Sequence, residues 1–163
     1  MTQYELLAPE SRTWIFQSAR ELRASESEKI TSELNAFVEN WLSHGSLLKA
    51  SYKLLHNRFI IFFADEEGDR MCGRAIDASV RFIRELEARY GLSLLERNRV
   101  AYIKNGKVLS CTLDELGQKI DDGEITSNTI LFNNLVSTRE EFEQSWMVPL
   151  SKSWHRSFAM QNQ

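Results

Sequence analysis

The feature that most constrains this chain is the run from Phe59 to Ala64, which reads FIIFFA and is apolar at every position. Successive side chains of a β-strand point to opposite faces of the sheet, so both faces of such a strand must be covered. The preceding run, from Leu47 to Leu55, alternates polar with apolar residues, as in a half-exposed edge strand. Because Asn tolerates positive φ at low cost, His56-Asn57 between the two runs predicts a hairpin with a two-residue turn.

Helical periodicity is present on both sides of this hairpin. Before it, Ser25 and Glu28 have the spacing of a capping box. The apolar residues from 30 to 42 then recur at helical intervals, and Gly45 supplies a stop. After the hairpin, apolar residues from 76 to 90 recur in the same way. The sequence therefore predicts one amphipathic helix on each side.

Two further short strands, at 14–18 and 100–103, complete an order of strand, helix, strand, strand, helix, strand. This is the order of the ferredoxin-like split βαβ fold, in which four antiparallel strands carry two helices on one face. The sequence therefore predicts an α+β fold with a ferredoxin-like core at about residues 12–104.

The residues after this core also carry regular signals. Asn105-Gly106 is a strong type I′ turn signal, so a strand at 108–111 is expected to return antiparallel to the one before it. Thr112 and Thr138 each precede a glutamate by three positions, which predicts two capped helices. We therefore expect an ordered C-terminal annex at about residues 105–160, mainly helical, and one domain over the whole chain.

Two helices on one face leave the other face of the 59–64 strand uncovered. Apolar residues of the annex recur at spacings typical of short helices, and we expect them to cover that face; a second copy of the chain is the alternative. These residues are Leu113, Leu116, Ile120, Phe142, Trp146, Leu150, Trp154 and Phe158.

Composition narrows the class of protein. The chain has 163 residues, 42% of them hydrophobic, and a formal net charge of −3, so no overall basic field favours nucleic acid or an anionic membrane. The N-terminus lacks the features of a signal peptide and no segment is apolar enough for a membrane span, so we expect a cytoplasmic protein. Cys72 and Cys111 lie far apart without metal-ligand spacing, which predicts free thiols rather than a zinc site or a disulfide.

Short motifs along nearly the whole chain carry a resemblance. They are Trp14-Ile15-Phe16-Gln17, Trp41 with His44-Gly45, Leu48-Lys49-Ala50-Ser51, Asn57-Arg58-Phe59, Ile76-Asp77 with Ser79-Val80 and Phe82-Ile83, Phe132-Asn133-Asn134-Leu135, and Pro149-Leu150 with Trp154-His155. With these motifs the chain resembles a family of small, functionally uncharacterised bacterial proteins, some of which are labelled "ABC transporter ATPase". The resemblance implies one full-length domain and no established activity. Members often read Gly-Cys-Ser-Ile-Asp where this chain has Gly73-Arg74-Ala75-Ile76-Asp77, so no cysteine chemistry is implied at that point.

The ATPase label is tested by the segment from Gly68 to Ala75, which follows a strand, precedes a helix and has the pattern G-x-x-x-x-G-R-A. A phosphate-binding loop needs Lys after the second glycine to reach the phosphates, and then Ser or Thr for magnesium. Arg74 and Ala75 occupy these two positions, and alanine has no atom that binds a metal. We therefore predict that this protein is not an ATPase.

The side chains best suited to catalysis are Asp65, Glu66, Asp77 and His44, with Cys72 as a further candidate. The acidic loop at 65–69 also offers oxygen ligands for a divalent cation, but it lacks the calcium-loop pattern, and a solvated loop near a helix N-terminus explains its charge. His44 is interpreted as closing the first helix, where the helix dipole favours an imidazolium. Cys72 lies near a helix start, where a thiolate is stabilised, but no sequence neighbour supplies a base.

Two functions remain open from the sequence. We predict a non-enzymatic binding or protein-interaction module, without a cofactor or a bound metal, whose partner is another protein, a second copy or a small ligand. The alternative is a small enzyme that uses the carboxylates with His44, with or without a divalent metal. The aromatic residues follow core periods and do not indicate a nucleic-acid surface. Basic residues near the strand ends are suited to bind an anion: Arg58, Arg97, Arg99, Lys104 and Lys107.

Overall fold

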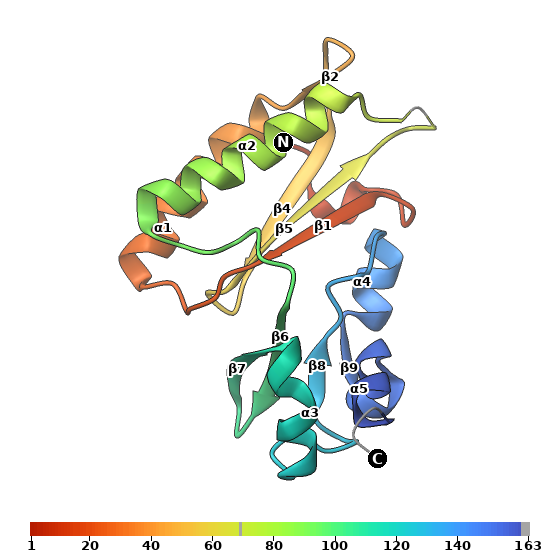
Figure 1. Cartoon of the computed structure of the whole chain (residues 1–163). Coiled ribbons are helices and arrows are strands. Elements are labelled where there is room, and N and C mark those ends of the chain that lie inside the picture. The colour runs from red at the N-terminus through yellow and green to blue at the C-terminus, as the bar shows by residue number, and fades with distance from the viewer. Residues whose placement is uncertain (69, 161–163) are drawn as a thin grey trace.

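The computed structural model describes residues 1–68 and 70–160, and it contains two main antiparallel sheets (Figure 1). The first sheet has the strand order β1-β5-β4, and helices α1 and α2 lie side by side on one of its faces. These elements are β1 (Arg12–Gln17), α1 (Ala24–Glu39), β4 (Lys49–Leu55), β5 (Phe59–Asp65) and α2 (Gly73–Tyr90). The turn between β4 and β5 has positive φ at His56 (55°) and Asn57 (49°), which confirms the predicted hairpin.

The second sheet has the order β7-β6-β8-β9. Its strands are β6 (Arg99–Lys104), β7 (Lys107–Thr112), β8 (Ile130–Phe132) and β9 (Met147–Pro149). The turn between β6 and β7 has positive φ at Asn105 (53°) and Gly106 (74°), so this predicted hairpin is also confirmed.

Short helices accompany the second sheet and the N-terminus. They are η1 (Tyr4–Leu6), α3 (Leu113–Asp121), α4 (Arg139–Ser145), η2 (Leu150–Lys152), η3 (Trp154–Arg156) and α5 (Ser157–Met160). The hydroxyl groups of Thr112 and Thr138 accept hydrogen bonds from the backbone at the starts of α3 and α4, which confirms the two predicted caps. Across the ranges 1–68 and 70–160, no helix is both long enough and apolar enough to cross a membrane.

The α+β class is confirmed, but β6 lies outside the first sheet. A ferredoxin-like core requires this strand to pair with β1, whereas among the described residues it pairs with β7 and β8. The outer edge of β1 is already bonded, because the N–H of Thr13 donates to the Ser137 carbonyl (2.9 Å) and the N–H of Arg139 donates to the Ser11 carbonyl (2.8 Å). An edge whose backbone groups are paired in this way does not accept another strand. The first sheet therefore has three strands, and β6 begins the second one.

Both faces of β5 are covered, as its sequence requires. Ile60, Phe62 and Ala64 belong to a core formed with α1 and α2. The alternate side chains of β5 belong to a second core, to which the annex contributes Phe142 and Trp146, so the expected cover of that face is confirmed. Most of the remaining expected residues form a third core against the second sheet, namely Leu113, Leu116, Ile120, Leu150 and Phe158. Trp154 instead remains 38% exposed.

Helix α1 ends earlier than its periodicity predicts. Its last residue is Glu39, and a small hairpin follows, made of β2 (Leu42–Ser43) and β3 (Ser46–Leu47). His44 and Gly45 form the turn of this hairpin with positive φ, 52° and 80°. The interpretation of His44 as a helix-closing residue is therefore wrong, because two successive residues with positive φ make a hairpin turn.

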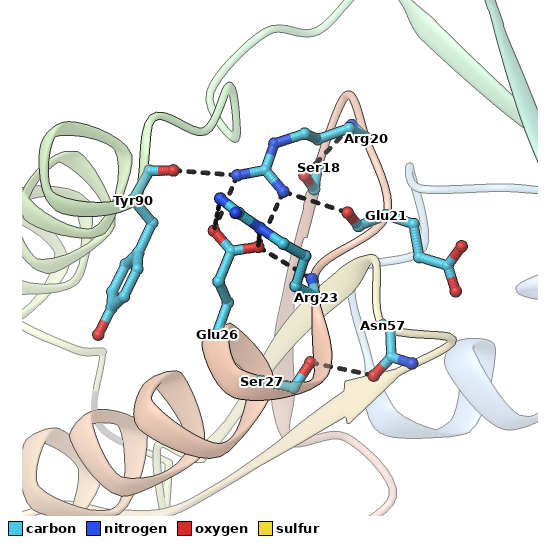
Figure 2. Close-up of polar contacts among 8 residues, drawn as sticks. All are labelled: Ser18, Arg20, Glu21, Arg23, Glu26, Ser27, Asn57 and Tyr90. Atoms are coloured by element: carbon cyan, nitrogen blue, oxygen red, sulfur yellow. Dashed lines mark hydrogen bonds and ion pairs between the residues drawn. The ribbon is translucent and has the colours of Figure 1, made fainter.

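Helix α1 also begins with a different cap from the predicted Ser25–Glu28 pair (Figure 2). The backbone N–H of Arg23 donates to Glu26 (2.9 Å), and the Arg20 guanidinium donates to both carboxylate oxygens of Glu26 (2.9 and 2.8 Å). Arg20 also donates to the Tyr90 carbonyl at the end of α2 (3.0 Å). The Arg20 guanidinium holds the pKa of Glu26 well below its usual range. This ion pair joins the loop after β1 to both helices and has a structural role.

Candidate functional site

The acidic loop borders a surface hollow of about 640 Å³. Asp65 and Glu66 line this hollow together with Arg12 and Arg70. Glu66 forms an ion pair with Arg12 (3.4 Å), and Asp65 accepts a hydrogen bond from the backbone N–H two residues further on (2.9 Å). Asp69 lies outside the described residues. Within the described part of the chain, no group of three or more His, Cys, Asp or Glu side chains is placed to hold a metal ion.

The other two acid–base candidates do not line this hollow. Asp77 projects from α2 into a separate surface depression that it shares with Arg81 and Arg84. The ring nitrogen Nε2 of His44 lies 2.9 Å from the backbone carbonyl of Arg70. The four predicted residues therefore do not gather in one cavity.

Cys72 is the N-cap residue of α2, and it is half-buried. A hydrogen bond from the backbone of His44, then the hydroxyl of Ser43 and the backbone of Ala75, lower the pKa of the Cys72 thiol to about 7. Burial has the opposite effect on Cys111 in β7 and raises its pKa to about 11. Both thiols are free, as predicted. The sequence indicates the helix start beside Cys72 but not the two hairpin residues that approach it.

A smaller and more enclosed cavity, of about 120 Å³, lies where the end of β1 meets the beginning of β6 and the end of β8. Its walls come from both sheets and from the segment around η3. The apolar part of the wall is formed by Ile15, Phe16, Leu94, Leu113, Phe132, Leu135 and Trp154. The polar part is formed by Gln17, Glu96, Arg97, Arg99, Asn134 and His155.

A chain of hydrogen bonds fixes the orientation of the Gln17 amide in this wall. The indole N–H of Trp146 donates to Oδ1 of Asn134 (3.0 Å), and Nδ2 of Asn134 donates to Oε1 of Gln17 (2.9 Å). Because an indole nitrogen only donates, the oxygen of Asn134 must face Trp146, and its amino group must face Gln17. The amino group of Gln17, Nε2, consequently points elsewhere. Nε2 is buried and has no hydrogen-bond partner, and Gln17 as a whole is only 5% exposed.

His155 adds a neutral ring to the same wall. Burial lowers the pKa of His155 to about 4, so the ring carries no charge at neutral pH. Its Nδ1 lies 2.6 Å from the hydroxyl of Ser153, which is buried and does not line the cavity. The ring of Trp154 stacks on His155 with 3.8 Å between centroids, and its indole N–H donates to Asn133 (3.1 Å).

Two of the predicted anion-binding residues reach this cavity. Arg99 is neutralised by Glu96, with 3.0 Å between Nε and the carboxylate oxygen. Arg97 is exposed and forms no ion pair within the described residues. Arg58 and Lys107 line a different hollow, beside the turn between β4 and β5.

The sequence assigns no ligand-binding role to the other polar residues of the cavity. Gln17, Asn134 and His155 stand in motifs of the resemblance, but that resemblance implies no established activity. Gln17 and Asn134 are 117 positions apart, and they meet only because the two sheets pack against each other. A local pattern of spacing does not encode such a contact.

Comparison with protein-family models, with curated proteins and with solved structures gave no match to this chain. The resemblance stated from the sequence motifs therefore stays a prediction.

Proposed function

We propose that this protein is a non-enzymatic binding module that holds a small ligand in the cavity between its two sheets. The observation that carries the proposal is the enclosed cavity itself, which lies between the two sheets and is lined by Gln17, a buried residue whose amino group has no hydrogen-bond partner. A buried donor left unpaired costs about 1–3 kcal/mol. A ligand that displaces the Gln17 side chain enough to accept a hydrogen bond from Nε2 removes this cost, and slightly more than half of the wall residues are apolar.

The size of the cavity limits the ligand. Its volume is about 120 Å³, and an apolar cavity of roughly 150 Å³ in another protein binds a single benzene molecule. The ligand, or the part of it that enters, is therefore about as large as one aromatic ring. Leu135, 67% exposed, and Trp154 lie at the cavity and leave its mouth open to solvent.

The geometry favours binding over catalysis. Asp65 and Glu66 line one hollow and Asp77 lines another, whereas His44 lines neither, so the carboxylates and the histidine of the alternative enzyme do not share one cavity. Inside the cavity, the Ser153 hydroxyl that approaches His155 is buried behind the wall and does not face a ligand. The described wall residues thus contain no nucleophile beside a base.

The test is a fragment screen by ¹H–¹⁵N NMR on the full chain. Fragments of one ring that carry a hydrogen-bond acceptor are expected to shift the side-chain amide signals of Gln17. The variant Gln17→Leu has a side chain of similar size but no amide group, so it is expected not to bind these fragments. Gln144→Leu, on the exposed surface of α4, is the matched control and is expected to bind as the native chain does. The proposal fails if no fragment shifts the Gln17 signals, or if Gln17→Leu binds the same fragments equally well.

A further inference from the structure

We infer that the ligand of this cavity is a neutral one-ring compound with a hydrogen-bond acceptor, and that this acceptor bonds to Nε2 of His155. This inference rests on the proposed function and names the chemical class of its ligand. It is supported by the accessibility of Nε2, by the hydrogen bonds that place a proton on it and by the charge of the cavity wall.

The first support is that Nε2 of His155 is a polar atom that a ligand can reach. It has no hydrogen-bond partner within residues 1–68 and 70–160, yet it is not one of the enclosed, unpaired side-chain atoms of this part of the chain, a group that includes Nε2 of Gln17. Nε2 of His155 therefore retains accessible surface. His155 as a whole is only 2% exposed and lines the cavity, while its Nδ1 faces Ser153 and one face of its ring stacks on Trp154. The accessible surface of Nε2 therefore lies on the cavity side of the ring.

The second support is the tautomer that Ser153 imposes on the ring. Oγ of Ser153 accepts a hydrogen bond from the backbone N–H of His155 (3.3 Å) and lies 2.6 Å from Nδ1. Ser153 is 2% exposed, and Nδ1 is the acceptor that the described residues offer to its hydroxyl proton. A neutral imidazole has one N–H, and burial lowers the pKa of His155 to about 4, so at neutral pH the ring proton is on Nε2. Nε2 is therefore a donor, and the ligand must offer it an acceptor.

The third support is the charge of the wall, which favours a neutral ligand over an ion. Glu96 and Arg99 form an ion pair with each other, and Arg97 is exposed to solvent. A carboxylate that entered the enclosed cavity would lose its water and gain a neutral donor in exchange, which does not offset the desolvation of an ion. A pyridine-type nitrogen or a carbonyl oxygen accepts the same hydrogen bond without that cost.

The experiment titrates the full chain with two matched pairs of probes, pyridine with benzene and acetophenone with benzoate. Long-range ¹H–¹⁵N NMR follows the two ring nitrogens of His155. In the ligand-free chain, Nε2 is expected to carry the proton. Pyridine has the shape of benzene with one acceptor nitrogen, so it is expected to shift the Nε2 signal more than benzene does. Acetophenone is expected to bind about tenfold more tightly than benzoate, which has a similar size but carries a charge.

A variant without Nε2 tests the role of this atom. His155→Phe keeps an aromatic ring in the wall, and it is expected to weaken pyridine about three- to tenfold and to change benzene less than about twofold. His56→Phe, at the exposed turn between β4 and β5, is the matched control and is expected to change neither.

A second variant tests the tautomer. Ser153→Ala removes the hydroxyl group beside Nδ1, so the proton is expected to be shared between the two ring nitrogens. If about half of the rings then lack a donor at Nε2, pyridine weakens about twofold and benzene is unchanged. Ser151→Ala, at an exposed position of η2, is the control and is expected to keep the native tautomer. The native chain decides the question even if a variant does not fold, because its tautomer and its response to pyridine are measured without a substitution.

The possible outcomes separate the two proposals. The inference is overturned, and the cavity remains a binding site, if Nε2 carries no proton in the ligand-free chain or if pyridine and benzene shift its signal alike. It is also overturned if benzoate binds as tightly as acetophenone, or if His155→Phe weakens pyridine no more than benzene. If no one-ring fragment shifts the Gln17 signals, the proposed function itself is overturned.

Discussion

The two sheets of this protein differ in the length of their strands and helices, and therefore in how much stability these elements supply by themselves. In the first sheet, β4 and β5 have seven residues each, and the covering helices have 16 and 18 residues. In the second sheet, β8 and β9 have three residues each, and α3 and α4 have nine and seven. Short strands and helices bury little surface by themselves and depend on packing against a neighbour.

For the second sheet, that neighbour is the face of β5 that α1 and α2 leave uncovered. Aromatic rings join the two, with centroid separations of 4.7 Å between Phe59 and Phe132, 5.0 Å between Phe59 and Trp146, and 5.2 Å between Phe63 and Phe142. Each half therefore completes the core of the other. The cavity with Gln17 lies at the same junction, where neither sheet alone provides a full wall.

Truncating the chain after Ser110 has the largest expected effect, because it removes most of the half that completes the core of the first sheet. The fragment 1–110 exposes Phe59, Ile61 and Phe63, which are fully buried in the intact protein. We expect an insoluble or self-associating product without a cooperative unfolding transition, because an apolar sheet face in water promotes association. Size-exclusion chromatography and denaturant unfolding, run beside the full chain, measure this. A soluble, monomeric and cooperatively folding fragment would show that the first half does not need the second.

A substitution within the first half comes next in size. Trp41 is 2% exposed, packs at tilted angles among aromatic rings and donates from its indole nitrogen to the Ala75 carbonyl (2.9 Å). We expect Trp41→Ala to lower the free energy of unfolding by about 3–5 kcal/mol, through the cavity and the lost hydrogen bond. Trp154→Ala is the matched change in the second half, and since that ring is partly exposed we expect about 1 kcal/mol or less. Urea midpoints decide, and similar losses at the two sites would contradict the assignment of Trp41 to the core.

The first half is also the part that the sequence predicts best. The run from Phe59 to Ala64, the His56-Asn57 turn and the helix ending at Tyr90 are strong local signals, and the structure contains each of them. The errors are at the ends of α1, where Glu26 caps the helix and His44 turns a hairpin. At each end the structure has a contact that is distant in sequence, from Arg20 to the Tyr90 carbonyl and from His44 to the Arg70 carbonyl, and such contacts outweigh local propensity.

In the second half, local sequence signals predict the turn and the helix caps but not how the elements pack. The Asn105-Gly106 turn and the caps at Thr112 and Thr138 are predictable from spacing alone. The departure of β6 from the first sheet is not, because it depends on residues 137–139 occupying the edge of β1. The cavity belongs to the same category: Arg97 was predictable as a basic residue, but its proximity to Gln17 follows only from the packing of the two sheets.

His155 is a buried, titratable residue of the second half, and it makes the stability of the folded chain depend on pH. An unfolded histidine has a pKa near 6.5, and burial lowers the pKa of His155 to about 4. Between these values the unfolded chain binds a proton that the folded chain does not, so stability is complete above pH 6.5 and falls as the pH drops toward 4. The expected loss from this one ring is about 3 kcal/mol.

The measurement compares denaturant unfolding of the native chain and of His155→Asn at pH 7 and pH 4. Carboxylates titrate in both proteins, so the difference between them isolates the ring. The variant is expected to lose about 3 kcal/mol less on acidification. His56→Asn, at an exposed turn of the first half, is the control and should behave as the native chain does. An equal loss of unfolding free energy on acidification in all three proteins would mean that the folded state does not lower the pKa of His155.

The smallest effect involves no loss of stability and compares one cysteine from each half. Cys72 in the first half has its pKa lowered to about 7 and is partly exposed, whereas Cys111 in the second half is buried and has its pKa raised to about 11. Because the thiolate is the reactive form, we expect iodoacetamide at pH 7.5 to alkylate Cys72 at least about a hundredfold faster than Cys111. Peptide mapping by mass spectrometry follows both sites in one sample. Ser43→Ala removes the hydroxyl group that helps to lower the pKa of the Cys72 thiol, so the rise in the alkylation rate of Cys72 with pH should move to higher pH while Cys111 is unaffected. Equal rates at the two thiols in the folded chain, or an unchanged pH profile in Ser43→Ala, would show that the hairpin beside α2 does not control the reactivity of Cys72.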